Sequence, residues 1–276
     1  MRDTRSRLQL KLDAAGRLFM WNWMSNRIPH YLVSEYPKSG GSWVSQMLAD
    51  YLRIPFPRNV SVWPLAKKSY LLHGHHPYSP RLKNAVYVMR DGRDVMTSWY
   101  FHCLFENERT HPGFVDRHRQ TLGLADPSDV YGNMPKFIEY TFASDSRRRF
   151  HFTWAEFVGG IDHDRALVVR YEDLLTDAEA EMRRVIECLV QESPDDQRLH
   201  ETVERFSFKN LASRAPGAEN RGSFLRKGVA GDWRDKFSPE ARRVFHQLAG
   251  TELIAAGYEA SDRWLHEDPE PHNAIV

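Results

Sequence analysis

The stretch 36-YPKSGGSWV-44 carries a lysine, two glycines and two serines in a short turn, a composition suited to binding an anion. It follows 30-HYLVSEY-36, a run typical of a buried strand, and leads into 42-SWVSQMLADYLRI-54, where apolar residues recur at helical spacing. Ser42 is expected to cap that helix. A turn between a strand and a helix presents backbone N–H groups at the positive end of the helix dipole, and glycines let an anion approach. The stretch therefore predicts a phosphate-binding turn.

The order of residues in this turn excludes the best-known phosphate loop. The Walker pattern G-x-x-x-x-G-K-[ST] places its lysine after the glycines. Here Lys38 precedes Gly40 and Gly41. The turn is therefore not a nucleoside triphosphatase P-loop of the Walker type.

Two other stretches combine cations with turns. In 86-VYVMRDGRDVMTSWY-100 a predicted strand ends at Arg90, and the helix that follows carries Ser98. Arg93 is interpreted as a surface charge, and Arg90 taken alone suits a surface salt bridge equally well. In 226-RKGVAGDWRDKF-237 two cations stand beside a glycine N–H, as a dianionic phosphate requires, although the string alone also fits a solvated basic turn.

These three stretches together resemble the motifs of the sulfotransferases that use 3′-phosphoadenosine 5′-phosphosulfate (PAPS). The first, at 36–43, resembles the family's phosphosulfate loop, and 86–100 resembles its 3′-phosphate segment, with an arginine and a serine eight residues later. The third resembles the family's Arg-Lys-Gly-x-x-Gly-Asp-Trp segment and is the most specific match. The resemblance implies PAPS as sulfuryl donor, its desulfated form (PAP) as product, and no metal.

The resemblance also implies which residues hold the donor. Trp43 and Phe208 are expected to stack on the adenine, with Ser207 and Tyr171 along the base and ribose. The whole set of implied donor-binding residues is Lys38, Ser39, Gly40, Gly41, Ser42, Trp43, Arg90, Ser98, Tyr171, Ser207, Phe208, Leu225, Arg226, Lys227 and Gly228.

Two residues are expected to act in the chemistry. Sulfuryl transfer builds negative charge on the bridging oxygen of the leaving 5′-phosphate, and Lys38 is expected to stabilise that charge. The acceptor must lose a proton, and histidine titrates near working pH. Among thirteen histidines, the resemblance selects His75 in 74-GHHP-77 as the general base.

The neighbouring histidines mark a departure from the family. Many relatives carry a lysine two residues before the catalytic histidine, where this chain has His73. Strand alternation puts His73 and His75 on one face, and His76 is interpreted as structural. The His-x-His pair also leaves a metal site open as the less favoured alternative.

Further departures are smaller. Of the two threonines that follow the glycine in many relatives, the second is Ser42 and the first is Gly41. Leu225 replaces a frequent methionine, and the dimerisation pattern of the animal cytosolic members is not kept in 234-RDKFSPEARR-243. The oligomeric state is therefore left open.

The elements that must position these residues form an alternating pattern. Apolar runs at 69–77, 85–89 and 166–175 continue the series begun at 30–36, with helices predicted between them and a closing helix at 239–258. Alternating strands and helices predict a single α/β domain with a central, mostly parallel sheet. Ligands bind at the carboxyl ends of such strands.

The domain limits follow from this pattern. We expect an N-terminal extension at 1–29, the sulfotransferase domain at 30–262 and a tail at 263–276. The aperiodic region 106–134 is interpreted as an acceptor lid, and 207–233 as irregular and basic.

The composition agrees with an ordinary globular protein. The chain has 276 residues, a net charge of +1 and only two cysteines, which favours a reducing, cytoplasmic location and gives no overall attraction to nucleic acid. The N-terminus lacks the apolar core of a signal peptide, and the aromatic run 18-LFMWNWM-24 is too short to span a membrane. That run is interpreted as core packing, with an interfacial anchor as the alternative.

The acceptor stays open. A small molecule, a lipid or a saccharide are all candidates, bound through a hydroxyl or an amine. The aromatic residues Trp99, Tyr100, Phe101 and Phe105 could wall a flat pocket or simply form one buried helix face, and 147-RRR-149 is interpreted as a solvated charge run. The rival functions are a P-loop-type kinase and a non-catalytic nucleotide-binding module.

Overall fold

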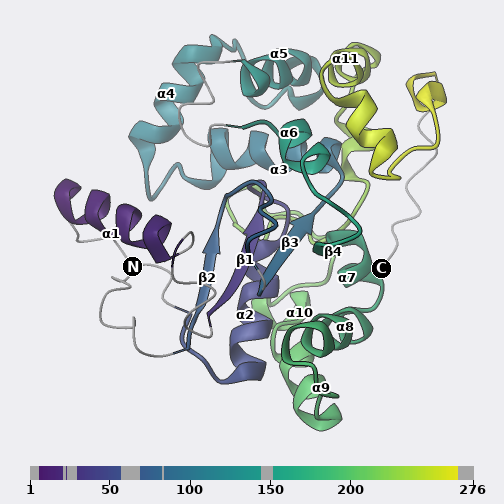
Figure 1. Ribbon diagram of the computed structural model, residues 1–276. Helices are drawn as coiled ribbons and strands as arrows, with labels where there is room; N and C mark the ends of the chain where they lie inside the picture. Colours follow the sequence, from purple (N-terminus) through teal and green to yellow (C-terminus); the bar gives the residue numbers. More distant parts are fainter. Residues whose placement is uncertain are drawn as a thin grey trace. The chain divides into compact units, whose positions relative to one another are not determined.

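The computed structural model describes residues 6–20, 23, 30–56, 69–82, 84–143 and 152–266. Its sheet has four parallel strands in the order β2-β1-β3-β4 (Figure 1). The strands are β1 (Tyr31–Glu35), β2 (Leu71–Gly74), β3 (Ala85–Met89) and β4 (Leu167–Arg170). The predicted α/β fold with a parallel sheet is thus confirmed, and all four expected apolar runs contribute a strand.

The chain divides into two compact units. The first consists of residues up to Glu35, Gly40–Met89 and Ile161–Ser207, and it holds the whole sheet. Its helices are α1 (Arg7–Phe19), α2 (Gly41–Leu52), α7 (Tyr171–Thr176), α8 (Ala178–Val190) and α9 (Asp196–Arg205).

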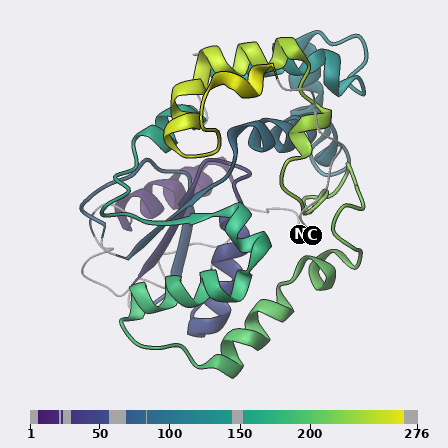
Figure 2. The same cartoon turned by 90° about the vertical axis from the view of Figure 1, so that its right-hand side faces the viewer.

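The core of the first unit lies between the sheet and helices α2, α8 and α9 (Figure 2). Val33, Val86 and Val169 each come from a strand and are fully buried. They pack in one cluster with Leu48 of α2 and Ile186 of α8. The β-branched residues suit a strand that is covered by helices, and their burial fixes the carboxyl ends of the strands in register.

The second unit is helical and consists of Tyr36–Ser39, Arg90–Gly160 and the chain from Phe208 onward. Its core contains Tyr100, Phe137, Trp154, Phe237 and Phe245, each at most 1% exposed. Its helices are α3 (Gly92–Phe101), the π-helix η3 (His102–Glu106), α4 (Pro112–Leu122), α5 (Val130–Phe142), α6 (Trp154–Gly159), α10 (Phe208–Ala212), η5 (Asp232–Asp235), α11 (Pro239–Ala255) and η6 (Asp262–Leu265).

The predicted helix starts are partly right. Ser238 caps α11, with Pro239 at its first position, as expected for the closing helix. The prediction that Ser42 caps α2 is wrong. The cap is Gly40, in a left-handed conformation with φ of 102°, so the helix starts at Gly41 and Ser42 lies inside its first turn.

The region 106–134 is more regular than its sequence predicts. It contains α4 and the start of α5. Proline opens α4, and Gly123 ends it in a left-handed conformation. The lid assignment stays a prediction. Residues 147–149, residues 21, 22 and 24 of the run 18–24, and residues 267–276 of the tail lie outside the described residues. In the run 18–24, Met20 is 2% exposed, but Phe19 and Trp23 are 47% and 71% exposed, so the core-packing interpretation is wrong for these two aromatic residues. Within the described part of the chain, no helix combines the length and apolarity of a membrane span.

Candidate active site

The turn after β1 is tight and carries two residues with positive φ. Lys38 has φ of 74°, unusual for a residue with a side chain, and Gly40 follows with φ of 102°. The Ser39 N–H donates to the Tyr36 carbonyl at 3.2 Å. Such strain on a lysine is kept only where the surroundings determine it, which makes this turn a candidate for function.

Gly41 is enclosed by two side chains of the same unit. Its N–H donates to Oε2 of Glu35 at 2.7 Å. A Cβ at position 41 would lie 2.8 Å from Cδ of Glu35 and 3.0 Å from Nε2 of His73. A side chain at position 41 would therefore require Glu35 or His73 to shift. The first turn of α2 therefore already binds a carboxylate, as expected of a helix N-terminus.

Glu35 also holds the histidine pair. Its Oε1 lies 2.9 Å from Nε2 of His73, and its backbone carbonyl lies 3.1 Å from Nδ1 of His75. Burial alone would raise the pKa of Glu35, but the hydrogen bond and charge of His73, the charge of His75 and the hydrogen bond from Gly41 together lower the pKa. The carboxylate is therefore ionised at neutral pH. Sequence reasoning missed Glu35, because the residue looked like part of a strand.

The hydrogen bond between His75 and the Glu35 carbonyl fixes the tautomer of His75. A carbonyl oxygen only accepts, so Nδ1 must carry the hydrogen in this bond, and Nε2 is left as the proton acceptor of the ring. The rings of His73 and His75 lie 5.4 Å apart, on one side as predicted.

Burial lowers the pKa of His76 to about 4, and the backbone of His76 exchanges hydrogen bonds with the Ser34 hydroxyl at 3.0 and 2.7 Å.

Two of the expected aromatic residues meet in the first unit. Nε1 of Trp43 donates to the Phe206 carbonyl at 2.8 Å, and its ring lies 6.1 Å from that of Tyr171. The Ser207 N–H donates to the Glu204 carbonyl at 3.2 Å.

Among the residues described, no cluster of three His, Cys, Asp or Glu side chains could hold a metal ion.

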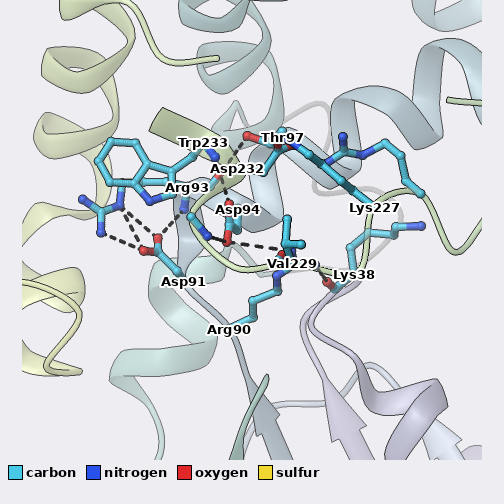
Figure 3. Close-up of polar contacts among 12 residues, drawn as sticks. Lys38, Arg90, Asp91, Arg93, Asp94, Thr97, Lys227, Val229, Asp232 and Trp233 are labelled. Carbon is cyan, nitrogen blue, oxygen red and sulfur yellow. Dashed lines mark hydrogen bonds and ion pairs between the residues drawn. The ribbon is translucent and has the colours of Figure 1, made fainter. Parts of the chain in front are cut away.

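In the second unit, Arg90 joins two of the predicted motifs (Figure 3). Its guanidinium donates to the Lys38 carbonyl at 3.3 Å and to the Val229 carbonyl at 3.2 Å. Asp94, one turn further along, accepts the N–H groups of Gly231 and Trp233 at 2.7 and 3.0 Å. The start of α3 thus gathers the lysine turn and the Arg-Lys-Gly segment into one cluster. Ser98 is half-buried on the same helix.

The cations of the Arg-Lys-Gly segment share a carboxylate. Nη2 of Arg226 lies 2.5 Å from Asp232, and Nζ of Lys227 contacts the other oxygen of Asp232. Burial alone would raise the pKa of Asp232, but the charge of Arg226 and the contacts with Lys227 lower it to about 2. Glu219 also pairs with Arg226. These contacts orient both cations.

The remaining predicted donor residues lie beside this segment. A Cβ at Gly228 would come 2.4 Å from the Phe208 ring, so this close approach requires glycine. The Leu225 carbonyl accepts a hydrogen bond from Arg214. Phe208 belongs to the second unit and Trp43 to the first.

The prediction that Arg93 is a surface charge is wrong. Arg93 is 1% exposed, and its guanidinium stacks 3.7 Å from the Trp233 ring centroid. It pairs with Asp91 at 2.7 Å and with Glu259 at 2.5 Å. Arg93 therefore packs against the tryptophan of the Gly-Asp-Trp turn, and two of its partners, Trp233 and Glu259, are distant from it in sequence.

The aromatic residues considered for an acceptor pocket are mostly core. Trp99, Tyr100 and Phe101 are at most 9% exposed, and Phe105 is half-buried. Tyr100 packs on Phe137 with ring centroids 5.0 Å apart. The buried-face interpretation is therefore correct for the first three residues.

The chain matches known proteins along most of its length. The model of the sulfotransferase domain family matches residues 68–257. Sulfotransferase 1A1 of Bos taurus is 25% identical, with 84% of this chain and 85% of that protein covered. Sulfotransferase 1 family member D1 of Rattus norvegicus is 24% identical, with coverage of 78% and 80%.

Solved structures with a fold similar to that of this chain include two that contain PAP. The mouse sulfotransferase SULT7A1, solved with PAP, superposes with a TM-score of 0.60 at 16% identity, covering 93% of this chain and 95% of the other. Retinol dehydratase, solved with androsterone and PAP, gives a TM-score of 0.54 at 15% identity, with coverage of 88% and 85%.

Proposed function

This chain belongs to the sulfotransferase domain family, and from that premise we propose that it transfers a sulfuryl group from PAPS to a hydroxyl or amine of a small-molecule, lipid or saccharide acceptor. The observation that carries the proposal is the bridge made by Arg90. One guanidinium holds the backbone of Lys38 and that of Val229, so two sequence motifs expected to bind anions meet in one cluster of charged side chains. PAPS supplies the sulfuryl group.

The residues fit a phosphorylated donor in two respects. The Ser39 hydroxyl is 1% exposed and has no hydrogen-bond partner among the residues that the structure describes, so a phosphate oxygen would satisfy it. The N-terminus of α2 already holds the Glu35 carboxylate, which supports an affinity for anions there. We therefore assign the 5′-phosphosulfate to residues 38–43.

The 3′-phosphate is assigned to Arg90, Ser98, Arg226, Lys227 and Gly228. Arg226 and Lys227 are held by Asp232, which restricts their motion before the donor arrives. Preorganised cations bind a phosphate at a lower entropic cost than free side chains do.

Lys38 and His75 are assigned to the chemistry. Lys38 offsets the charge that develops on the bridging oxygen as the S–O bond breaks. His75 takes the proton from the hydroxyl or amine of the acceptor substrate at Nε2, because its Nδ1 hydrogen is donated to the Glu35 carbonyl. His73 is assigned a supporting role, held by the Glu35 carboxylate.

For the acceptor we propose a class of compound, and for the location of the protein a kind of compartment. Retinol dehydratase was solved with androsterone, and this supports an apolar small molecule among the acceptors to be tried first. Cys103 and Cys188 are both free thiols, which supports a reducing compartment such as the cytoplasm.

The proposal is tested by transfer of radiolabelled sulfate from PAPS to a panel of phenols, sterols, glycolipids and oligosaccharides. We expect labelled product with at least one class, and no labelled product from the Lys38→Ala variant. A phosphoryl-transfer enzyme would instead transfer labelled phosphate from ATP to a compound of the panel. A non-catalytic nucleotide-binding module would bind PAP and transfer no labelled group from PAPS or from ATP.

A further inference from the structure

Lys38, the proposed catalytic cation, is engaged by a carboxylate of its own unit. Its Nζ lies 3.0 Å from Oε2 of Glu106, and the side chains are only 8% and 13% exposed. The same ammonium lies 4.3 Å from the ring centroid of Phe224. The lysine is therefore held between a carboxylate and an aromatic face.

Glu106 is ionised at any pH at which the enzyme would work. Burial alone would raise its pKa, but the hydrogen bond with His102 and the charge of Lys38 lower it to about 2. Nδ1 of His102 lies 2.9 Å from the same oxygen that Lys38 contacts. The contact between Lys38 and Glu106 is therefore an ion pair.

The backbone fixes Glu106 in this position. It is the last residue of the π-helix η3, which continues α3, the helix that begins just after Arg90. Asn107 donates from Nδ2 to the His102 carbonyl at 3.0 Å and closes the end of this turn. Short π-helical segments often occur at functional sites, because the wider turn redirects the side chains on it.

An anion that binds Lys38 must compete with this carboxylate. The 5′-phosphate of the donor is expected at Lys38, and a negative charge at 3.0 Å from the ammonium lowers the attraction for it. The ion pair also keeps a long, flexible side chain in one orientation, which favours correct placement when the donor replaces the carboxylate.

We propose that Glu106 is a positioning residue that holds Lys38 as an internal counter-ion and is replaced on Lys38 by the donor. The inference rests on the proposed function, because it takes Lys38 as the ligand of the 5′-phosphate. It assigns to Glu106, which lies outside the sequence motifs, a control over donor affinity that is exerted through Lys38.

The test measures PAP binding by calorimetry, at one fixed ionic strength, in four proteins: wild type, Glu106→Gln, Lys38→Ala and the double variant. Glu106→Gln removes the charge and keeps an oxygen for His102. We expect it to tighten PAP binding roughly tenfold, within the range for directly contacting residues. In the Lys38→Ala background the same change should alter the affinity less than about twofold.

Glu108→Gln is the matched control. Glu108 lies two residues further on, is 58% exposed and pairs with Arg119. Its substitution should leave PAP affinity within about twofold of wild type. In steady-state assays Glu106→Gln should lower the KM for PAPS while kcat changes less than about threefold. If Glu106→Gln does not fold, Glu106→Asp, which withdraws the carboxylate from Lys38, should tighten PAP binding in the same direction.

The outcomes separate the two proposals. Wild-type protein that fails to bind PAP overturns both of them. Wild-type protein that binds PAP, with Glu106→Gln binding no more tightly, overturns only the role of Glu106. Equal tightening with and without Lys38 also overturns it, because the effect would then not pass through the ion pair.

Discussion

Nε2 of His73 lies 2.9 Å from Oε1 of Glu35, while the other oxygen of that carboxylate accepts the Gly41 N–H at 2.7 Å. One buried side chain thus links the end of β2 to the first turn of α2. His73 is thus supported by a buried carboxylate.

Glu35→Gln should reduce the free energy of unfolding by roughly 1–3 kcal/mol at neutral pH, because it removes the charged partner of His73. The folded-state pKa of Glu35 is below its ordinary value of 4.5, so its stabilisation is present above about pH 4.5 and is lost as pH falls through the folded-state pKa. Urea denaturation at about pH 7 and about pH 3 should show that the difference in the free energy of unfolding between wild type and variant is smaller at the lower pH. A larger difference at the lower pH would contradict this account.

Gly41→Ala should destabilise the protein by about 1–3 kcal/mol, because the new Cβ would come within 2.8 Å of Glu35. Gly113→Ala in α4 is the control, since its Cβ would meet nothing within 4 Å, and it should be neutral or stabilising by up to about 1 kcal/mol. Thermal unfolding of both variants decides the matter. Equal effects would mean that Glu35 and His73 do not enclose position 41 as described.

Local features explain why so much of the fold could be predicted. The strand at 85-AVYVM-89 is wholly apolar and fully buried, and Ser238 with Pro239 begins a helix by rules that need no tertiary partner. Runs of this kind carry their own structural signal, so the parallel sheet and the closing helix follow from the sequence.

Partners distant in sequence explain what could not be predicted. Arg93 looks like a surface charge until Trp233 and Glu259 are seen to surround it. Glu106 is one of many acidic residues until the π-helix η3 places it against Lys38, which lies 68 residues earlier. The left-handed conformation of Gly40 likewise shifts the start of α2 and takes the capping role from Ser42.

Arg93→Ala should lower the free energy of unfolding by about 3–5 kcal/mol, because it leaves the carboxylates of Asp91 and Glu259 without their shared cation in a buried setting. Arg183→Ala removes the ion pairs of an arginine that is 34% exposed, with Glu179 and Asp196, and should lower the free energy of unfolding far less than Arg93→Ala does. Chemical denaturation compares the two. Similar small losses would place Arg93 among ordinary surface charges after all.

His75→Ala should lower kcat by roughly 10²–10⁴-fold while PAP affinity changes less than about twofold, because the histidine is assigned to the acceptor proton and not to the donor. Transfer assays and PAP calorimetry on the same preparation separate these effects. Full activity in this variant would assign proton transfer to another group, with His73 the next to test.

The central claim is that separate cationic groups recognise the 5′ and 3′ ends of a single desulfated donor. Calorimetric titration of the wild-type protein with PAP and with 5′-AMP, which lacks the 3′-phosphate, tests it most directly. We predict that PAP binds at least about a hundredfold more tightly, as a dianion meeting Arg90, Arg226 and Lys227 should. Equal affinity for the two nucleotides would contradict the assignment of the 3′-phosphate and with it the proposed donor.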